Sequence, residues 1–356
     1  MLSSIEAHGF TRCQNDAMNR PRSSGRTCLA LMLCAGFSLA GLADRSRAFT
    51  AGQGPTQRSI AITVDDVPGA LAGTDRGLGD VNELQRINRA LPEILRAHHV
   101  PAIGFVNEYK LQVTGERDAR AALLQMWLDA GLTLGNHTYS HPDLQTTPLA
   151  EFEDDTIRGA VVTHVLMAAA GKTEKYFRHP FLDTGPTPEV KAAFELFLKQ
   201  HGYTVAPVTI DPMDWMFNDV LGKALETKDK KLAAKAKKAS LEYLDTAFEY
   251  FEGVSRNLFG REIPQILLLH DTELDAEELD AMLERIEQRG YRFVSLDEAM
   301  ADPAYATPDL YVSGEGVSWL NRWRLAFGQD PDTKHNPDPP KWVMQTSKDY
   351  RASKSN

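Results

Sequence analysis

The sequence predicts an α/β fold built on a parallel sheet, most simply a barrel, and two regularities support this. Short apolar runs alternate about seven times with longer amphipathic stretches, the order expected of strands separated by crossover helices. Most of the apolar runs are almost continuously hydrophobic, the pattern of parallel strands that are buried on both faces. The chain has 356 residues, of which 42% are hydrophobic and 25% charged, so it can bury a large core.

The predicted strands are apolar runs bounded by polar or turn-forming residues. The first run stops at two neighbouring carboxylates, Asp65 and Asp66. In chain order, the seven runs are SIAITV (59–64), AIGFV (102–106), LTLG (132–135), YFRHPF (176–181), YTVAPVTI (203–210), QILLL (265–269) and YRFVSL (291–296).

Apolar residues that recur every three or four positions predict helices between these strands. The clearest series spans residues 81–95, and a second spans residues 241–251. Gly131 and Gly290 follow two helical stretches, at the place where a left-handed C-terminal residue is expected. The crossover at 221–263 is unusually long and predicted to be helical, and it contains a lysine-rich stretch that we expect to be solvated.

Residues 1–48 differ in character from the rest of the chain and are predicted to be a signal peptide and leader. Arginines precede the apolar run 28–43, and small residues that include Ser46 and Ala48 follow it. Because a membrane span needs roughly 20 residues, this run favours a cleaved leader over an uncleaved anchor. We therefore expect an exported protein, periplasmic or secreted, with no stable membrane insertion after the leader is removed.

Removal of the leader would change two bulk properties of the chain. All three cysteines lie in it, so disulfides would not stabilise the mature protein. The whole chain has a net charge of −10, and residues 1–48 carry six arginines and three acids, so their loss would leave 33 basic and 46 acidic residues and a net charge of −13. Such an acidic balance disfavours a nucleic-acid-binding groove, which needs a basic stripe.

Residues 301–356 are predicted to form an extension that packs on the barrel and is partly irregular. The stretch GQDPDTKHNPDPPKW, which starts at Gly328, is rich in proline and aspartate and is predicted to be irregular or wrapped around the body. Trp319 and Trp323 lie four residues apart, a spacing that indicates a helix face packed on the body of the protein.

Polar residues with chemical capability follow the predicted strands. Asp65 and Asp66 come after the first strand, NHTYSHPD (136–143) after the third, and HD (270–271) after the sixth. In a barrel of parallel strands these ends share one rim, where active sites are built. Residues that are far apart in the sequence are therefore expected to converge there.

His137 and His141 are four residues apart, a spacing that can bring two imidazoles within reach of one cation. A carboxylate from a neighbouring strand end would complete a set of three ligands and leave open positions, as a catalytic metal site requires. Either Asp65 or Asp66 could be that ligand, while the other accepts a proton. Two imidazoles and a carboxylate favour zinc, with cobalt, nickel or manganese as alternatives.

Five short motifs carry a family resemblance: TVDD, HTYSH, RHPF, DPMDW and LLLHD, in this order. They resemble the signature motifs of the polysaccharide deacetylases with a NodB-homology domain (carbohydrate esterase family 4). The resemblance spans roughly Ser59 to Ala299, so we expect a NodB-like deacetylase domain at 56–300. It implies a distorted (β/α)7 barrel with its active site at the C-terminal rim of the parallel strands. It also implies a hydrolase that removes N-acetyl or O-acetyl groups from a carbohydrate polymer with the help of one divalent metal ion.

The same resemblance implies which residues hold the metal and activate water. Asp66, His137 and His141 match the metal ligands of the family. Asp65 matches the general base that deprotonates the attacking water, and Arg178 matches the arginine that pairs with this base and restrains its pKa.

The remaining matched residues would act on the leaving group and the acetyl group. His270 matches the general acid that protonates the leaving amine, and Asp214 matches the carboxylate that orients it and keeps it charged, with Trp215 beside it. Leu268 would line the pocket for the acetyl methyl group. The backbone N–H of Phe181 corresponds to the donor that stabilises the oxyanion together with the metal.

The first motif departs from the family pattern at Val67, which is followed by Pro68 and stands where glycine is usual. A β-branched residue does not easily adopt a positive φ, so we expect this loop to turn differently. Three alternatives remain open at this point: an O-acetyl esterase, a hydrolase of a small non-sugar amide, and a carbohydrate-binding homologue without turnover.

Overall fold

The computed structural model describes residues 58–314, 316–331 and 335–354. These residues belong to one structural unit, Pro55–Asn356. The predicted leader, residues 1–48, lies outside the described residues. Among the helices of the described ranges, none is both long enough and apolar enough to span a membrane.

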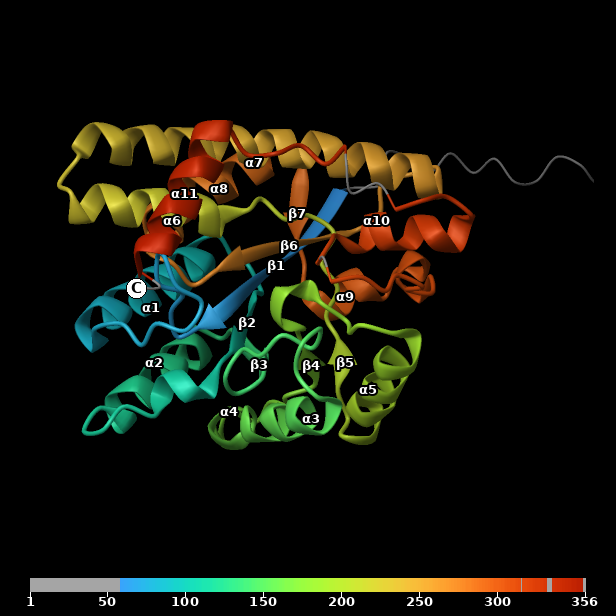
Figure 1. The fold of residues 1–356 in the computed structure, drawn as a ribbon, viewed down its shortest axis with the longest axis horizontal. Coiled ribbons are helices and arrows are strands. Elements are labelled where there is room, and N and C mark those ends of the chain that lie inside the picture. The colour runs from blue at the N-terminus through green and yellow to red at the C-terminus, as the bar shows by residue number, and fades with distance from the viewer. Residues whose placement is uncertain (1–57, 315, 332–334, 355–356) are drawn as a thin grey trace, which may run out of the picture. The chain divides into compact units, whose positions relative to one another are not determined.

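A parallel sheet of seven strands forms the centre of the described chain (Figure 1). The strands are β1 (Arg58–Val67), β2 (Ile103–Val106), β3 (Thr133–Asn136), β4 (Tyr176–Phe177), β5 (Thr204–Val205), β6 (Gln265–His270) and β7 (Tyr291–Phe293). Hydrogen-bonded neighbours follow the order β5-β4-β3-β2-β1-β6, and β7 pairs with the start of β1. A further parallel bridge joins Ile210, beyond β5, to Leu267 of β6, so the sheet curls back on itself. This arrangement confirms the predicted α/β fold with a distorted barrel.

All seven predicted strands are present, but β4, β5 and β7 are shorter than their apolar runs indicated. After β4 the chain turns into the 3-10 helix η2 (Pro180–Leu182), whose first residue has no N–H to donate to a ladder. β5 ends just before the segment that contains Pro207, and Ile210 then pairs with β6 instead of β4. The run 203–210 therefore supplies two separate contacts to the sheet.

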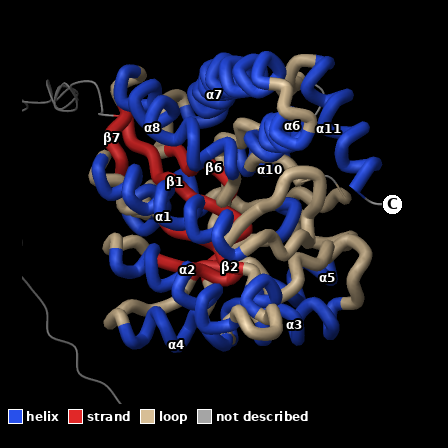
Figure 2. Tube along the Cα trace, turned by 90° about the vertical axis from the view of Figure 1, so that its left-hand side faces the viewer, coloured by secondary structure: helices blue, strands red, loops and turns tan. Residues whose placement is uncertain are grey.

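Helices surround the strands, as Figure 2 shows. The structure confirms the helical series at 81–95 and 241–251, and Gly131 and Gly290 have the expected positive φ of 85° and 84°. The helices are α1 (Val81–Ala97), α2 (Arg117–Asp129), α3 (Leu149–Arg158), α4 (Val161–Ala169), α5 (Pro188–Gln200), α6 (Asp214–Glu226), α7 (Lys230–Phe259), α8 (Glu273–Gln288), α9 (Leu296–Met300), α10 (Trp319–Trp323) and α11 (Lys341–Lys354), with the 3-10 helices η1 (Glu108–Leu111), η3 (Pro303–Ala306) and η4 (Arg324–Phe327).

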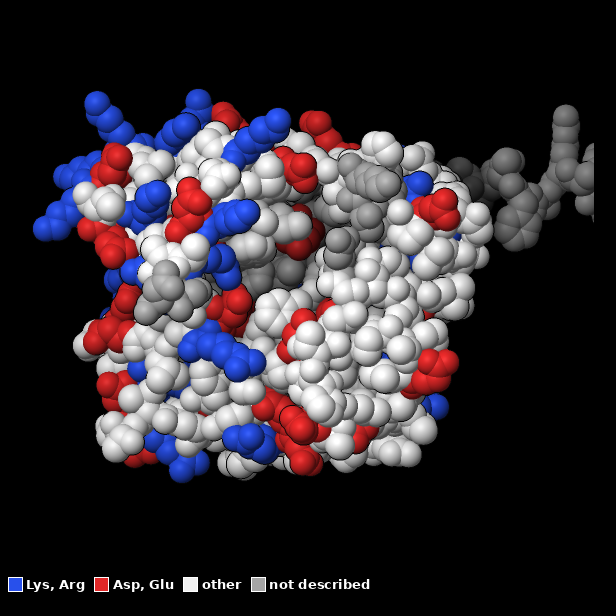
Figure 3. All heavy atoms as spheres, viewed as in Figure 1, with Lys and Arg blue, Asp and Glu red and all other residues white. Residues whose placement is uncertain are grey.

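The long crossover consists of the two helices α6 and α7, and basic side chains gather where one turns into the other (Figure 3). In the extension, Trp319 and Trp323 are buried in α10, which confirms that they pack on the body. The described residues of the proline- and aspartate-rich stretch, 328–331 and 335–340, contain no helix or strand, and α11 follows at residues 341–354. α11 packs against α6.

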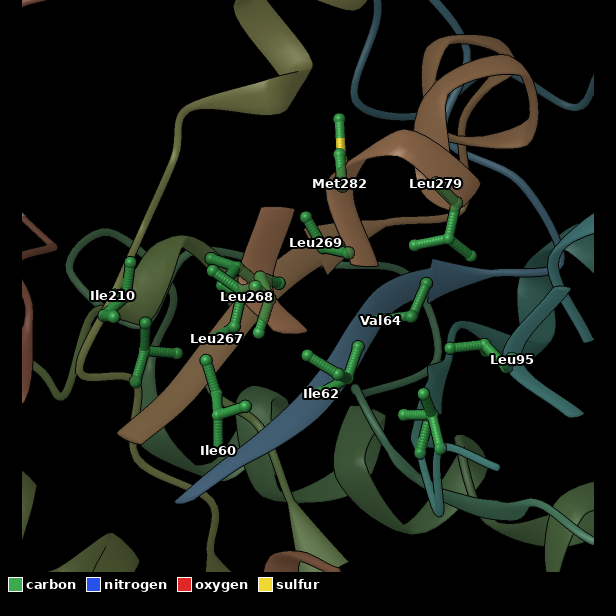
Figure 4. Packing of buried hydrophobic residues seen from close by; sticks show 14 of the residues in the cluster. Ile60, Ile62, Val64, Leu95, Ile210, Leu267, Leu268, Leu269, Leu279 and Met282 are labelled. Atoms are coloured by element: carbon green, nitrogen blue, oxygen red, sulfur yellow. The ribbon is translucent and has the colours of Figure 1, made fainter. Parts of the chain in front are cut away.

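The described residues form four hydrophobic clusters, and alternate residues of β1 belong to two of them. Ile60, Ile62 and Val64 belong to the larger cluster, which packs against the helices; Figure 4 shows this cluster, with Leu279 and Met282 of α8 above the strands. Ala61 belongs to a smaller cluster on the opposite side of the sheet. Because side chains alternate along a strand, Thr63 and Asp65 face the same side as Ala61.

Candidate active site

The ends of neighbouring strands bring the predicted site residues together. Asp65 and Asp66 lie inside β1, near its end, rather than after it. In the register of the sheet, Asp65 is paired with His270, the last residue of β6. β3 and β4 end directly before His137 and Arg178. Residues separated by more than 200 positions therefore meet at one rim of the barrel.

Asp66, His137 and His141 form a candidate metal site of three residues. One ligand atom from each lies within 4.8 Å of the other two. His137 Nδ1 donates a hydrogen bond to the Arg178 carbonyl oxygen (2.9 Å), which leaves Nε2 available for a cation. Burial lowers the pKa of both imidazoles and so favours the neutral form that binds metals. The donor set fits a divalent cation that keeps open positions.

The backbone around this site is strained. Asp66, Thr138 and His141 have positive φ values of 69°, 67° and 54°, which cost about 1–3 kcal/mol each in residues other than glycine. At Asp66 this conformation breaks the alternation of the strand, so that both acids line the same cavity. The different turn expected at Val67 is therefore made one residue earlier, while Val67 itself continues the ladder opposite Val106.

Asp65 is a buried carboxylate with one free acceptor. Its Oδ2 lies 3.3 Å from Arg178 Nη1 and 3.7 Å from His137 Nε2. Its Oδ1 has no hydrogen-bond partner among the described residues. Burial raises the pKa of Asp65 to about 6, although Arg178 and His270 oppose the rise. Asp65 is therefore mostly ionised at neutral pH and poised to accept a proton.

Lys110 stands beside Asp66 and was not recognised from the sequence. Its Nζ donates to the Asp66 carbonyl oxygen (2.9 Å) and lies 3.3 Å from Asp66 Oδ1, and the lysine is buried. Burial alone would raise the pKa of Asp66, but the neighbouring Lys110 ammonium is the strongest opposing influence, and the pKa is held well below the usual range. The only sequence signal was the position of Lys110 shortly after β2, within η1.

His270 and the buried Asp214 form an ion pair beside the site. His270 Nδ1 donates to Asp214 Oδ1 (2.8 Å), and the backbone N–H of His270 donates to Asp214 Oδ2 (2.7 Å). Burial disfavours the imidazolium, but Asp214 more than offsets it, so the pKa of His270 is raised to about 10. His270 is therefore charged at neutral pH.

A cavity of about 360 Å³ opens over these groups, and Leu268, Trp215 and Phe181 line it. The face seen in Figure 3 is hollowed near its centre, with acidic atoms visible inside. Arg351 of α11 lies over the Trp215 ring, 4.5 Å from its centroid, and pairs with Asp219 of α6 (2.6 Å). The C-terminal extension thus supplies part of the cavity wall, which the sequence had not indicated.

Phe181 stands at the mouth of this cavity. Its side chain is 46% exposed, and its ring lies edge-on to His141 with centroids 4.5 Å apart. Within the described residues, its backbone N–H makes no hydrogen bond and remains available as a donor. The neighbouring His179 is buried against Phe177 and Phe194 and takes no part in the site.

One protein-family model matches part of this chain. Residues 52–206 match the family model described as polysaccharide deacetylase. Over this span the chain is similar to polysaccharide deacetylases. Four residues of the candidate site lie beyond the matched span. Trp215, Leu268 and His270 line the cavity, and Asp214 is hydrogen-bonded to His270.

Two curated proteins illustrate what this chain is similar to. The peptidoglycan-N-acetylmuramic acid deacetylase PdaA of Bacillus subtilis (strain 168) is 22% identical over 223 residues, which are 61% of this chain and 68% of PdaA. An uncharacterized 30.6 kDa protein of Geobacillus stearothermophilus is 24% identical over 221 residues, 62% of this chain and 68% of that protein.

Solved structures of two family 4 carbohydrate esterases are also similar. One, from Streptomyces lividans in complex with acetate, has a TM-score of 0.41 and 18% identity and covers 68% of this chain and 95% of that one. The other, a pseudoenzyme from Bacillus anthracis, has a TM-score of 0.45 and 18% identity and covers 69% of this chain and 66% of that one.

Proposed function

We propose that this chain is a metal-dependent hydrolase that removes N-acetyl or O-acetyl groups from an extracellular or cell-wall carbohydrate. The observation that carries the proposal is that one proton acceptor and one proton donor both lie beside the candidate metal site. Asp65, an acceptor, and His270, a donor, both line the cavity that contains Asp66, His137 and His141. A binding module would have no use for both carriers.

Asp66, His137 and His141 would hold the cation, and the donor set favours zinc, with cobalt, nickel or manganese as alternatives. When bound, such a cation supplies Lewis acidity, which polarises the acetyl carbonyl and makes a water molecule easier to deprotonate. The neutral imidazoles and the ionised Asp66 leave these ligands ready to bind without first releasing a proton.

Asp65 would act as the general base. Its raised pKa of about 6 lies close to neutrality, where a base combines ionisation with useful proton affinity. Arg178 is fully buried, and its Nη2 donates to Thr63 Oγ1 (2.9 Å), which fixes the guanidinium beside Asp65. This ion pair restrains the pKa of the base and orients the carboxylate.

His270 would act as the general acid that protonates the leaving nitrogen or oxygen. Asp214 holds the imidazole through Nδ1, so Nε2 carries the proton that can be donated. The Phe181 N–H would stabilise the negative oxygen of the tetrahedral state. Leu268 and Trp215 would enclose the acetyl methyl group.

We infer that catalysis belongs to a domain at 56–300, that residues 301–356 form an extension to it, and that the leader exports the protein. An acetylated carbohydrate would be the partner, since the family acts on such substrates. The acidic chain and the mixed charges visible in Figure 3 do not favour a nucleic acid.

Acetate release by the purified protein tests this proposal. We expect release from N-acetylated chitooligosaccharides or peptidoglycan fragments, loss of release after treatment with a chelator, and recovery after zinc is added. Asp65→Asn is the matched control, because it should fold and keep the metal ligands but lose turnover. Release only from acetylated xylan or aryl acetates would support an O-acetyl esterase. Sugar binding that survives Asp65→Asn, without acetate from any substrate, would contradict the proposal.

A further inference from the structure

The turn that carries the Phe181 N–H has an unusual backbone. Phe181 has φ 56° and ψ 12°, and Leu182 has φ 55°, so two successive residues with side chains are left-handed. Such conformations persist only where the surrounding structure holds them. The hydrogen bonds from Leu182 N to His179 O (3.1 Å) and from Asp183 N to Pro180 O (3.0 Å) lie within the turn itself. The outside support comes from the C-terminal extension.

Arg322 of α10 is the main outside contact of this turn. The guanidinium is 1% exposed, and its Nη2 donates to the Leu182 carbonyl oxygen. Its Nε donates to Val317 O (2.9 Å), and its Nη1 donates to Thr184 Oγ1 (3.2 Å) and lies 3.4 Å from Asp309 Oδ2. A single planar group thus joins the turn to the extension on both sides.

Gly316 is the second contact. A Cβ atom added at this position would lie 1.7 Å from the Phe181 carbonyl oxygen and 3.1 Å from Leu182 Cβ. Only a residue without a side chain allows the extension to approach the turn this closely. The carbonyl groups of both left-handed residues therefore face the extension, one against Gly316 and one against Arg322.

The extension is itself anchored to the barrel between these two contacts. Ser318 Oγ donates to Thr209 O (2.7 Å), and Trp319 N donates to Val208 O (2.7 Å). Ser318, Trp319 and Arg322 are all buried. The support is therefore tied to the segment that joins β5 to β6, and the turn cannot shift without disturbing it.

We propose that Arg322 and Gly316 are positioning residues, which hold the Phe181–Leu182 turn so that the Phe181 N–H points at the developing oxyanion. The expected effect on catalysis rests on the proposed function. The claim that Arg322 and Gly316 hold the turn does not depend on it. It makes the extension a working part of the active site, although the residues that match the family model end at 206.

A purely structural role would give a different result. Loss of packing in the extension would lower the melting temperature, yet each molecule that remained folded would keep its full kcat. A positioning role predicts a lower kcat in folded protein with little change in KM, because the oxyanion interaction forms only in the transition state.

Gly316→Ala tests the inference, and Gly314→Ala is the matched control. Both glycines lie in the same loop, but the atoms nearest to a Cβ at Gly314 would belong to the Gln145 side chain, at 3.2 Å or more. Arg322→Lys is the second variant, because lysine keeps the charge but its single nitrogen cannot reach the four acceptors that the guanidinium contacts. The measurements on the full chain are kcat, KM, zinc content and hydrogen–deuterium exchange of the peptide 178–184.

Loss of an oxyanion donor lowers kcat about 100- to 1000-fold, so displacement of the donor should lower it at least about tenfold. We expect this in Gly316→Ala and Arg322→Lys, with KM within about threefold, unchanged zinc content and faster exchange of 178–184. Gly314→Ala should resemble the wild type. Unchanged exchange in both variants would overturn the support of the turn, whether or not the wild type is active. Faster exchange with unchanged kcat in an active enzyme would overturn the positioning role, whereas a wild type without acetate release would contradict the proposed function alone.

Discussion

Replacement of Asp214 by asparagine should shift the alkaline limit of activity. The carboxylate accepts hydrogen bonds from the imidazole Nδ1 (2.8 Å) and from the backbone N–H of His270 (2.7 Å). Asparagine has nearly the same shape but no charge, and its single oxygen can accept only one of these bonds well. The imidazolium would then stay buried without its counter-ion.

The size of the effect follows from the ion pair. An opposite charge in contact changes a pKa by about one to three pH units, each worth about 1.4 kcal/mol. The pKa of His270, about 10 in the intact protein, should fall by that amount in Asp214→Asn. His270 is protonated at pH values below its pKa. When this pKa falls in Asp214→Asn, the imidazolium is lost at a lower pH than in the wild type. A bound cation would lower the pKa of His270 in both proteins. The prediction therefore concerns the difference in this pKa between the wild type and Asp214→Asn.

The assay is kcat/KM for acetate release between pH 5 and pH 10. The activity ratio of wild type to Asp214→Asn should be about 2- to 100-fold larger at pH 9 than at pH 6. Asp219→Asn is the control, because Asp219 also lies in α6 and binds Arg351 but does not contact His270. It should leave the position of the alkaline limb unchanged. An alkaline limb that Asp214→Asn does not move would refute the assignment of His270 as the acid held by Asp214.

Three further results are expected. His137→Ala should lose zinc, measured by metal analysis after dialysis. Asp65→Asn should retain zinc but lose at least about 100-fold in kcat. The reverse pattern would mean that the roles of metal ligand and general base are exchanged. Leu268→Phe should fill the space for the methyl group and lower kcat/KM about tenfold or more without loss of zinc, and an unchanged value would exclude Leu268 from the acetyl pocket. Burial raises the pKa of Glu174 from its ordinary value of 4.5 to about 8. Between these two pH values the folded state keeps a proton that the unfolded state has released. Stability should therefore fall as pH rises between these values, and Glu174→Gln should raise the melting temperature by a few degrees at pH 8 but not at pH 4.5.

Much of the fold could be read from the sequence, because parallel strands and amphipathic helices leave strong periodic signals. All seven strands were recognised. Because the strands of a parallel barrel end at one rim, the sequence also predicted that Asp65, His137 and His270 lie close together. Strand length was harder to judge. The runs that contain β4 and β5 are apolar because they are buried, not because they are paired along their whole length.

Other features could not be read from the sequence, because they depend on contacts between distant segments. The side of α11 that packs on the body includes Ser347 beside Val343 and Tyr350, so its apolar periodicity is weak. Lys110 and Arg322 are buried by partners far along the chain, and isolated basic residues usually indicate a solvated surface. The left-handed conformation of Asp66 was equally hidden, since an aspartate tolerates this conformation but does not require it.

The central claim is that one cation is held by Asp66, His137 and His141, with Asp65 and His270 on either side of it. Anomalous diffraction at the zinc absorption edge, from crystals grown with Zn²⁺, tests this most directly. The expected result is a single peak about 2.0–2.2 Å from a carboxylate oxygen of Asp66, from His137 Nε2 and from a ring nitrogen of His141. Asp65 and His270 should face the cation without binding it. A zinc ion bound by Asp65 instead of Asp66, or no zinc ion at this rim of the barrel, would contradict the account.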